Sequence, residues 1–143
     1  MPQESELTMR NCLEEIPRIA RTVEAFCAQH ALAPRIATHL TLALDELATN
    51  AISHGFPPDH TRDGAVRLRL ALERDTVHAV IEDDGRPFDP LAVPPADTGL
   101  ALEDRAIGGL GVHIVRAVMD DVRYERADGV NRVHLRKRCT PAD

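Results

Sequence analysis

The chain has 143 residues, a formal net charge of −6 and 43% hydrophobic residues, enough for one globular domain with its own core. Only 3% of the residues are aromatic and Trp is absent, so the sequence does not predict a surface that stacks nucleic-acid bases. The negative charge also argues against binding of a nucleic-acid backbone.

The polar, acidic N-terminal segment and the lack of a long apolar run predict neither a secretory signal nor a membrane span. Three cysteines without paired spacing suggest neither a disulfide framework nor a metal site. We therefore expect a cytoplasmic protein with no nucleic-acid or membrane partner.

The first half of the chain predicts one weak strand and two helices. Residues 4–11 alternate weakly, as in an edge strand. Apolar residues recur with helical spacing over 14–30, with Pro17 in the first turn, where a missing N–H costs little. A second helix begins at Pro34 and runs to about His54, where Gly55 and two prolines end it.

The second half predicts strands, a long irregular segment and a third helix. Four segments alternate apolar and polar residues as half-buried strands do: 65–73, 76–82, 122–126 and 132–138. Asp128-Gly129 is typical of the turn between the last two. Prolines exclude regular structure over most of 87–107, which predicts a functional lid, and 108–120 predicts a helix.

This order of elements contains no parallel strand–helix–strand rhythm. It predicts an α+β fold, a two-layer α/β sandwich whose mixed, mostly antiparallel sheet is covered on one face by helices. We expect a single domain over residues 1–143. A basic cluster near the end is expected to be a solvated strand edge: Arg132, Arg136, Lys137 and Arg138.

The second helix carries a carboxylate and a carboxamide on one face. Glu46 and Asn50 are four residues apart and project together. A carboxylate can take a proton from a hydroxyl, and a carboxamide oxygen is a good Mg²⁺ ligand. His54, one turn further, can reach the same edge. The alternative is a solvent-facing polar stripe.

Two further segments have the chemistry of a nucleotide site. Asp83 ends an apolar strand, where it can accept a hydrogen bond from an exocyclic amine, and Gly85 lets the backbone approach a ligand. The alternative is an ordinary Asp-Asp-Gly turn. Gly108-Gly109-Leu110-Gly111 opens a helix and offers N–H groups to phosphate; the alternative is a flexible loop. Arg105 adds a charge nearby, or is a surface arginine.

Together the three segments resemble the histidine-kinase-like (GHKL) ATPases with the Bergerat fold, and within them the RsbW-type anti-sigma-factor serine kinases. The resemblance rests on three motifs that cover most of the chain: Leu44-Asp45-Glu46-Leu47-x-x-Asn50-Ala51-x-x-His54-Gly55, Asp83-Asp84-Gly85-Arg86-Pro87-Phe88-Asp89-Pro90, and Gly108-Gly109-Leu110-Gly111-Val112 with the Met119-Asp120-Asp121-Val122 ending.

The resemblance implies an ATP site with a role for each motif. Asn50 would bind Mg²⁺, and Glu46 would activate the acceptor hydroxyl. Asp83 would hold the adenine amino group, with room provided by Gly85. The phosphates would lie near His54 and at the lid, held by these residues: Arg105, Gly108, Gly109, Leu110, Gly111 and Val112.

The implied function is an ATP- and Mg²⁺-dependent serine/threonine protein kinase that acts as an anti-sigma factor. Its acceptor would be an anti-anti-sigma protein with a STAS domain, which competes with a sigma factor for the kinase. The alternative is an ATP-binding module that sequesters either partner without phosphoryl transfer. The resemblance leaves a homodimer open.

Overall fold

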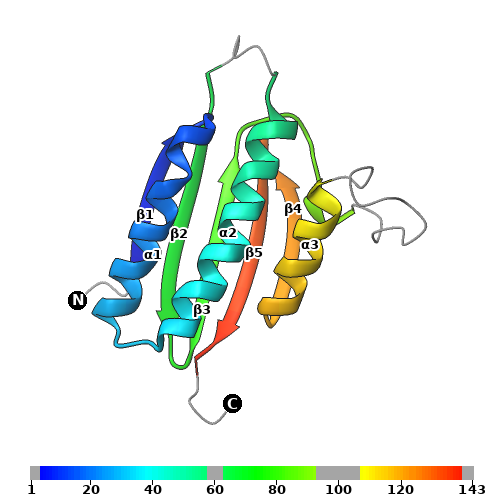
Figure 1. Ribbon diagram of the computed structural model, residues 1–143. Helices are drawn as coiled ribbons and strands as arrows, with labels where there is room; N and C mark the ends of the chain where they lie inside the picture. Colours follow the sequence, from blue (N-terminus) through cyan, green and yellow to red (C-terminus); the bar gives the residue numbers. More distant parts are fainter. Residues whose placement is uncertain (1–3, 58–62, 93–106, 140–143) are drawn as a thin grey trace.

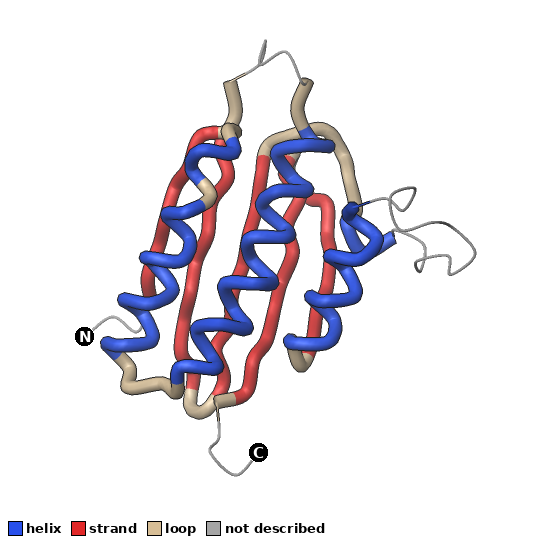
Figure 2. The backbone as a smooth tube through the Cα atoms, in the orientation of Figure 1, coloured by secondary structure: helices blue, strands red, loops and turns tan. Residues whose placement is uncertain are grey.

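The computed structural model describes residues 4–57, 63–92 and 107–139. Three helices lie side by side on one face of a five-stranded sheet (Figures 1 and 2). The elements in chain order are β1 (Glu4–Arg10), η1 (Leu13–Glu15), α1 (Pro17–Gln29), α2 (Pro34–Gly55), β2 (Ala65–Glu73), β3 (Thr76–Asp83), η2 (Pro90–Ala92), α3 (Ile107–Val118), β4 (Asp121–Ala127) and β5 (Val130–Arg138).

The sheet has the strand order β1-β2-β3-β5-β4. All four neighbouring pairs are antiparallel, so the two-layer α+β fold is confirmed, and the described pairings contain no parallel component. No helix in the described ranges has the length and apolar character needed to span a membrane.

Proline sets the start of the first two helices. Pro17 and Pro34 each occupy the first turn, where a residue without an N–H and with a fixed φ fits well. The expected helix over 14–30 is therefore divided into the short η1 and a later α1. The third helix ends at Val118, two residues earlier than expected, because β4 already begins at Asp121.

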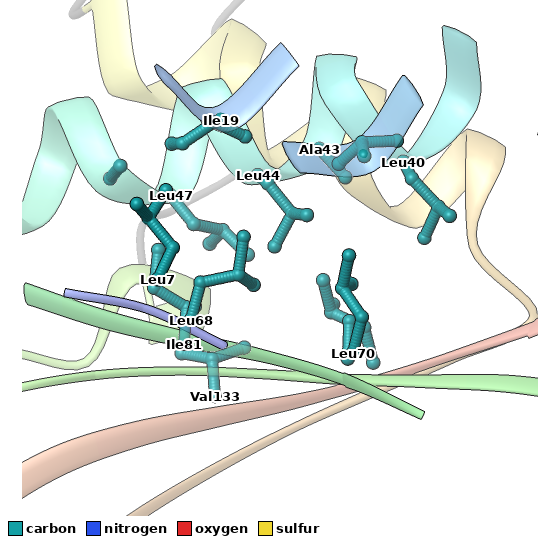
Figure 3. Packing of buried hydrophobic residues seen from close by; sticks show 14 of the residues in the cluster. Leu7, Ile19, Leu40, Ala43, Leu44, Leu47, Leu68, Leu70, Ile81 and Val133 are labelled. Carbon is teal, nitrogen blue, oxygen red and sulfur yellow. The ribbon is translucent and has the colours of Figure 1, made fainter. Parts of the chain in front are cut away.

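The core lies between the helices and the inner face of the sheet. Leu44 of α2 has no exposed surface and faces Leu68 and Leu70 of β2 (Figure 3). On β3, Val77, Ala79 and Ile81 point to the helices in strand alternation. The same alternation directs the last residue of β3, Asp83, toward the helical layer.

The prediction of a solvated strand edge for the basic cluster is wrong in two respects: β5 is paired on both sides, with β3 and β4, and Lys137 is not solvated. This residue is buried at an inward position of β5, and its Nζ donates a 2.6 Å hydrogen bond to the Val118 carbonyl at the end of α3. A cation there also complements the helix dipole. Arg132 lies on the uncovered face, where it pairs with Glu82 (2.8 Å) and Glu125 (3.0 Å).

A substitution in the β4–β5 turn can test the effect of backbone conformation separately from side-chain packing. Gly129 has φ +80°, and a Cβ there would have no atom within 4 Å. Gly129→Ala should therefore lower the free energy of unfolding by about 1 kcal/mol through backbone strain only, measured by urea denaturation. Gly129→Asn is the control and should cost less, because Asn tolerates positive φ. Equal losses would contradict the explanation.

Candidate functional site

Glu46 and Asn50 lie together on α2, on the side that faces α3. Asn50 is 4% exposed and its amide nitrogen has no hydrogen-bond partner. Glu46 is partly buried, and this burial raises the pKa of its carboxyl. Burial, and then the charge of Glu46, also raises the pKa of Asp45. The alternative prediction, a polar stripe that faces solvent, is therefore wrong for Asn50.

The side chain of Glu46 rests on the backbone of Gly111. A Cβ at Gly111 would overlap the carboxylate carbon of Glu46, so only glycine leaves room for this contact. The predicted glycine-rich start of a helix is confirmed, with Gly111 in the second turn of α3. The carboxylate is thus held beside the helix end that the sequence predicts to bind phosphate.

Asp83 is a buried carboxylate with two donors at one oxygen. Its Oδ1 accepts from the Gly85 N–H at 2.9 Å and from Asn131 Nδ2 at 3.0 Å. Burial raises the pKa of Asp83, against the opposing effect of these two hydrogen bonds. Neither bond uses Oδ2, which leaves that oxygen for another donor.

Gly85 allows the turn after β3 to pack on the end of α2. A Cβ at this position would lie 2.5 Å from the Gly55 carbonyl oxygen. The next residue, Arg86, donates its N–H to Gly55 (2.9 Å) and its Nε to the carbonyl of His54 (2.6 Å). The turn therefore satisfies two carbonyls that the end of a helix leaves without partners.

Sequence reasoning missed Asn131, which connects several parts of the site. Asn131 is 3% exposed; its Nδ2 also donates to the Arg86 carbonyl (2.8 Å), and its Oδ1 accepts from Phe88 N–H (3.2 Å) and Tyr124 O–H (2.6 Å). The available signal was that Asn131 alternates with inward Val133 on one face of the strand, but the strand was expected to begin at residue 132, two residues after its start at Val130.

Arg126 was missed as well. Its Nη1 donates a 2.8 Å hydrogen bond to the Gly85 carbonyl, which fixes the β4–β5 hairpin to the turn after β3. The residue is exposed, but it shares the helix-facing side of β4 with Val122 and Tyr124 and pairs with Asn131, so strand alternation was a signal that could have found it.

The remaining predicted residues are placed in different ways. His54 is exposed, and its ring stacks on Phe88 with centroids 4.9 Å apart. Gly108, Gly109 and Leu110 fall within α3. Val112 follows them in α3 and is 5% exposed, so its place at a ligand site stays a prediction.

Arg105 lies outside the described residues. The expected lid over 87–107 is described only at its two ends, 87–92 and residue 107; the first end includes η2. Its role as a lid stays a prediction.

Of the cavities that adjoin the turn after β3, two reach Gly85 or Phe88. The larger, about 560 Å³, is lined by His54, Gly85, Arg86 and Arg126 among others, and does not include Glu46 or Asn50. The smaller, about 10 Å³, lies between Asp83, Asn131 and Phe88. The smaller cavity adjoins Asp83, which is predicted to bind the adenine amino group, and it holds roughly one water molecule.

Comparison with known proteins supports the predicted relationship. The chain is 34% identical to the serine/threonine-protein kinase BtrW of Bordetella bronchiseptica over 107 residues, 75% of this chain and 74% of that protein. It is 30% identical to the serine-protein kinase RsbW of Bacillus pumilus over 64% of this chain. The aligned part spans 59% of that RsbW.

The fold and the family model agree with these relatives. The RsbU and RsbW domains of a Mycobacterium tuberculosis protein superpose with a TM-score of 0.67 at 17% identity, over 94% of this chain and 32% of that one. The model of the histidine kinase-like ATPase domain matches residues 9–137. The predicted resemblance is thereby confirmed: the chain belongs to the histidine kinase-like ATPase family and is related to its RsbW-type members.

Proposed function

We propose that this chain is an ATP-dependent protein-serine/threonine kinase that acts as an anti-sigma factor on a STAS-domain acceptor. The observation that carries the proposal is the contact between Glu46 and Gly111, which holds a partly buried carboxylate at the start of a glycine-rich helix. The kinase names of the BtrW and RsbW relatives support it.

ATP would bind between the end of β3 and α3. The adenine amino group would donate to Asp83, whose Oδ2 is not used by Gly85 or Asn131. Backbone N–H groups of the first turn of α3, which includes Gly109, would hold the phosphates, and Gly111 would keep the space beside them free of a side chain. Since the cavity beside Asp83 has a volume of only about 10 Å³, purine binding requires a shift of its walls.

Asn50 is the residue that fits a magnesium ion. Its carboxamide is buried, its nitrogen lacks a partner, and it lies one turn from Glu46. A single protein oxygen is consistent with Mg²⁺ chemistry, because this ion keeps several waters and is shared with substrate phosphates. The ion would neutralise charge on the phosphates.

Glu46 would act as the base for the acceptor hydroxyl. It would accept the proton of a serine while the serine oxygen bonds to the γ-phosphorus and ADP leaves. A carboxylate with a raised pKa is the stronger base, and burial supplies this shift at Glu46. We assign His54 and Arg105 to the nucleotide as well, because the resemblance to the RsbW-type kinases implies this role for both.

The proposal is tested by phosphoryl transfer from radiolabelled ATP to each STAS-domain protein of the source organism. The wild type should label at least one of them, and Glu46→Gln should reduce the rate by a factor of 10²–10⁴ with unchanged ATP affinity. ATP binding without labelling of any acceptor would support the alternative, a regulatory module that sequesters its partner.

Asn50→Ala should weaken binding of ATP only when magnesium is present. The variant removes the proposed metal ligand and leaves the adenine contacts in place. By calorimetry, the wild type should bind ATP more tightly with Mg²⁺ than with EDTA, whereas the two affinities should converge in the variant. A magnesium effect of full size in Asn50→Ala would remove Asn50 from the metal site.

The rate of transfer should depend on pH through Glu46. A base must be ionised, so kcat should rise with pH as the carboxyl loses its proton. Because burial raises its pKa, the midpoint of this acidic limb should lie above the ordinary value of 4.5. Measured kcat against pH checks this; a midpoint at or below 4.5 would contradict the assignment.

A further inference from the structure

Two large apolar side chains are exposed on the helices that hold the site. Leu42 of α2 is 46% exposed and Ile114 of α3 is 43% exposed. In the described parts of the chain, the one other large hydrophobic residue with such exposure is Leu13, at 54%. Single exposed leucines are common on protein surfaces. Whether this pair indicates a binding surface therefore depends on where the two residues lie.

Leu42 and Ile114 lie on the same side of the Glu46–Gly111 contact. Leu42 precedes Glu46 by one helical turn on the same face, and Ile114 follows Gly111 by one turn. Helices α2 and α3 run in opposite directions (Figure 1), so both steps lead the same way along the helix pair. Leu42 is therefore about 6 Å along α2 from Glu46, and Ile114 is about 4.5 Å along α3 from Gly111.

The acceptor protein must cover this part of the surface. A base acts within about 2.6–3.2 Å of the hydroxyl from which it takes the proton, so the acceptor serine has to reach Glu46. Residues next to that serine then contact the turns that adjoin Glu46. The other exposed residues of α2 beyond its first turn are Thr38, Ser53 and His54, which leaves Leu42 as the apolar contact point on this helix.

We propose that Leu42 and Ile114 form an acceptor-docking patch that binds an apolar side chain beside the acceptor serine. The inference rests on the proposed kinase function and adds the means by which the protein substrate is held. We assign the patch to the acceptor and not to a second copy of this chain, because a second copy docked there would obstruct access to Glu46.

The test compares steady-state transfer by Leu42→Ser and Ile114→Ser with the wild type, using the STAS-domain protein labelled in the transfer assay. Each variant should raise KM for the acceptor protein about tenfold, a typical effect for a central interface residue. The KM for ATP and the melting temperature should stay unchanged. Leu42→Met should restore the wild-type KM, because it returns an apolar side chain of similar volume.

Leu13→Ser is the matched control. Leu13 is equally apolar and more exposed, but it lies in η1 between β1 and α1, on the flank of the molecule opposite α3 (Figure 1). This variant should leave KM for the acceptor unchanged. An increase as large as that of Leu42→Ser would overturn the proposal, since the effect would not depend on position.

The outcomes separate this proposal from the function on which it rests. Normal acceptor KM in both patch variants, together with wild-type transfer, overturns the docking patch alone. Absence of transfer by the wild type overturns the proposed function and removes the occupant of the patch. Conversion of a dimer to a monomer by Leu42→Ser in sedimentation would assign the patch to a second copy, and the proposal would be wrong.

Discussion

The hydrogen bond between Asp83 and Asn131 determines how the chain is arranged at the site. The two residues are register partners on β3 and β5, both at inward positions, and their side chains are 3.0 Å apart. Asn131 also bonds to Arg86 and Phe88. The turn that caps α2 and the first residues of the expected lid therefore both depend on this pair.

This arrangement has a cost in stability. An apolar pair at the positions of Asp83 and Asn131 would extend the core. Asp83 is instead a buried carboxyl, and its burial raises its pKa. The folded state thus binds this proton more tightly than the unfolded state does. The contribution of Asp83 to stability is therefore greatest at low pH and is lost as pH rises through the raised pKa. Such a group is retained where binding rather than stability requires it.

Local patterns in the sequence predict the elements and the three motifs, because each depends on neighbours along the chain. Pro34 and Gly55 bracket α2, and Asp128-Gly129 indicates the last hairpin. Strand order and register involve residues far apart, so the burial of Lys137 and the four hydrogen bonds of Asn131 were not predictable from one sequence. An error of two residues at the start of β5, which was expected at 132 and begins at Val130, was enough to leave Asn131 in a turn.

Helix α3 would contact both ligands of the proposed kinase, the phosphates of ATP and the acceptor protein. Its end is fixed to the sheet by Lys137 through the Val118 carbonyl, while its start contacts Glu46 through Gly111. Phosphates bound at the start and an acceptor docked on Ile114 would act on this same helix. By linkage, if binding of one ligand through α3 changes the affinity for the other, the second ligand changes the affinity for the first by the same factor. Because Glu46 fits against Gly111 without space for a methyl group, even a small displacement of α3 also moves the surface that supports the base.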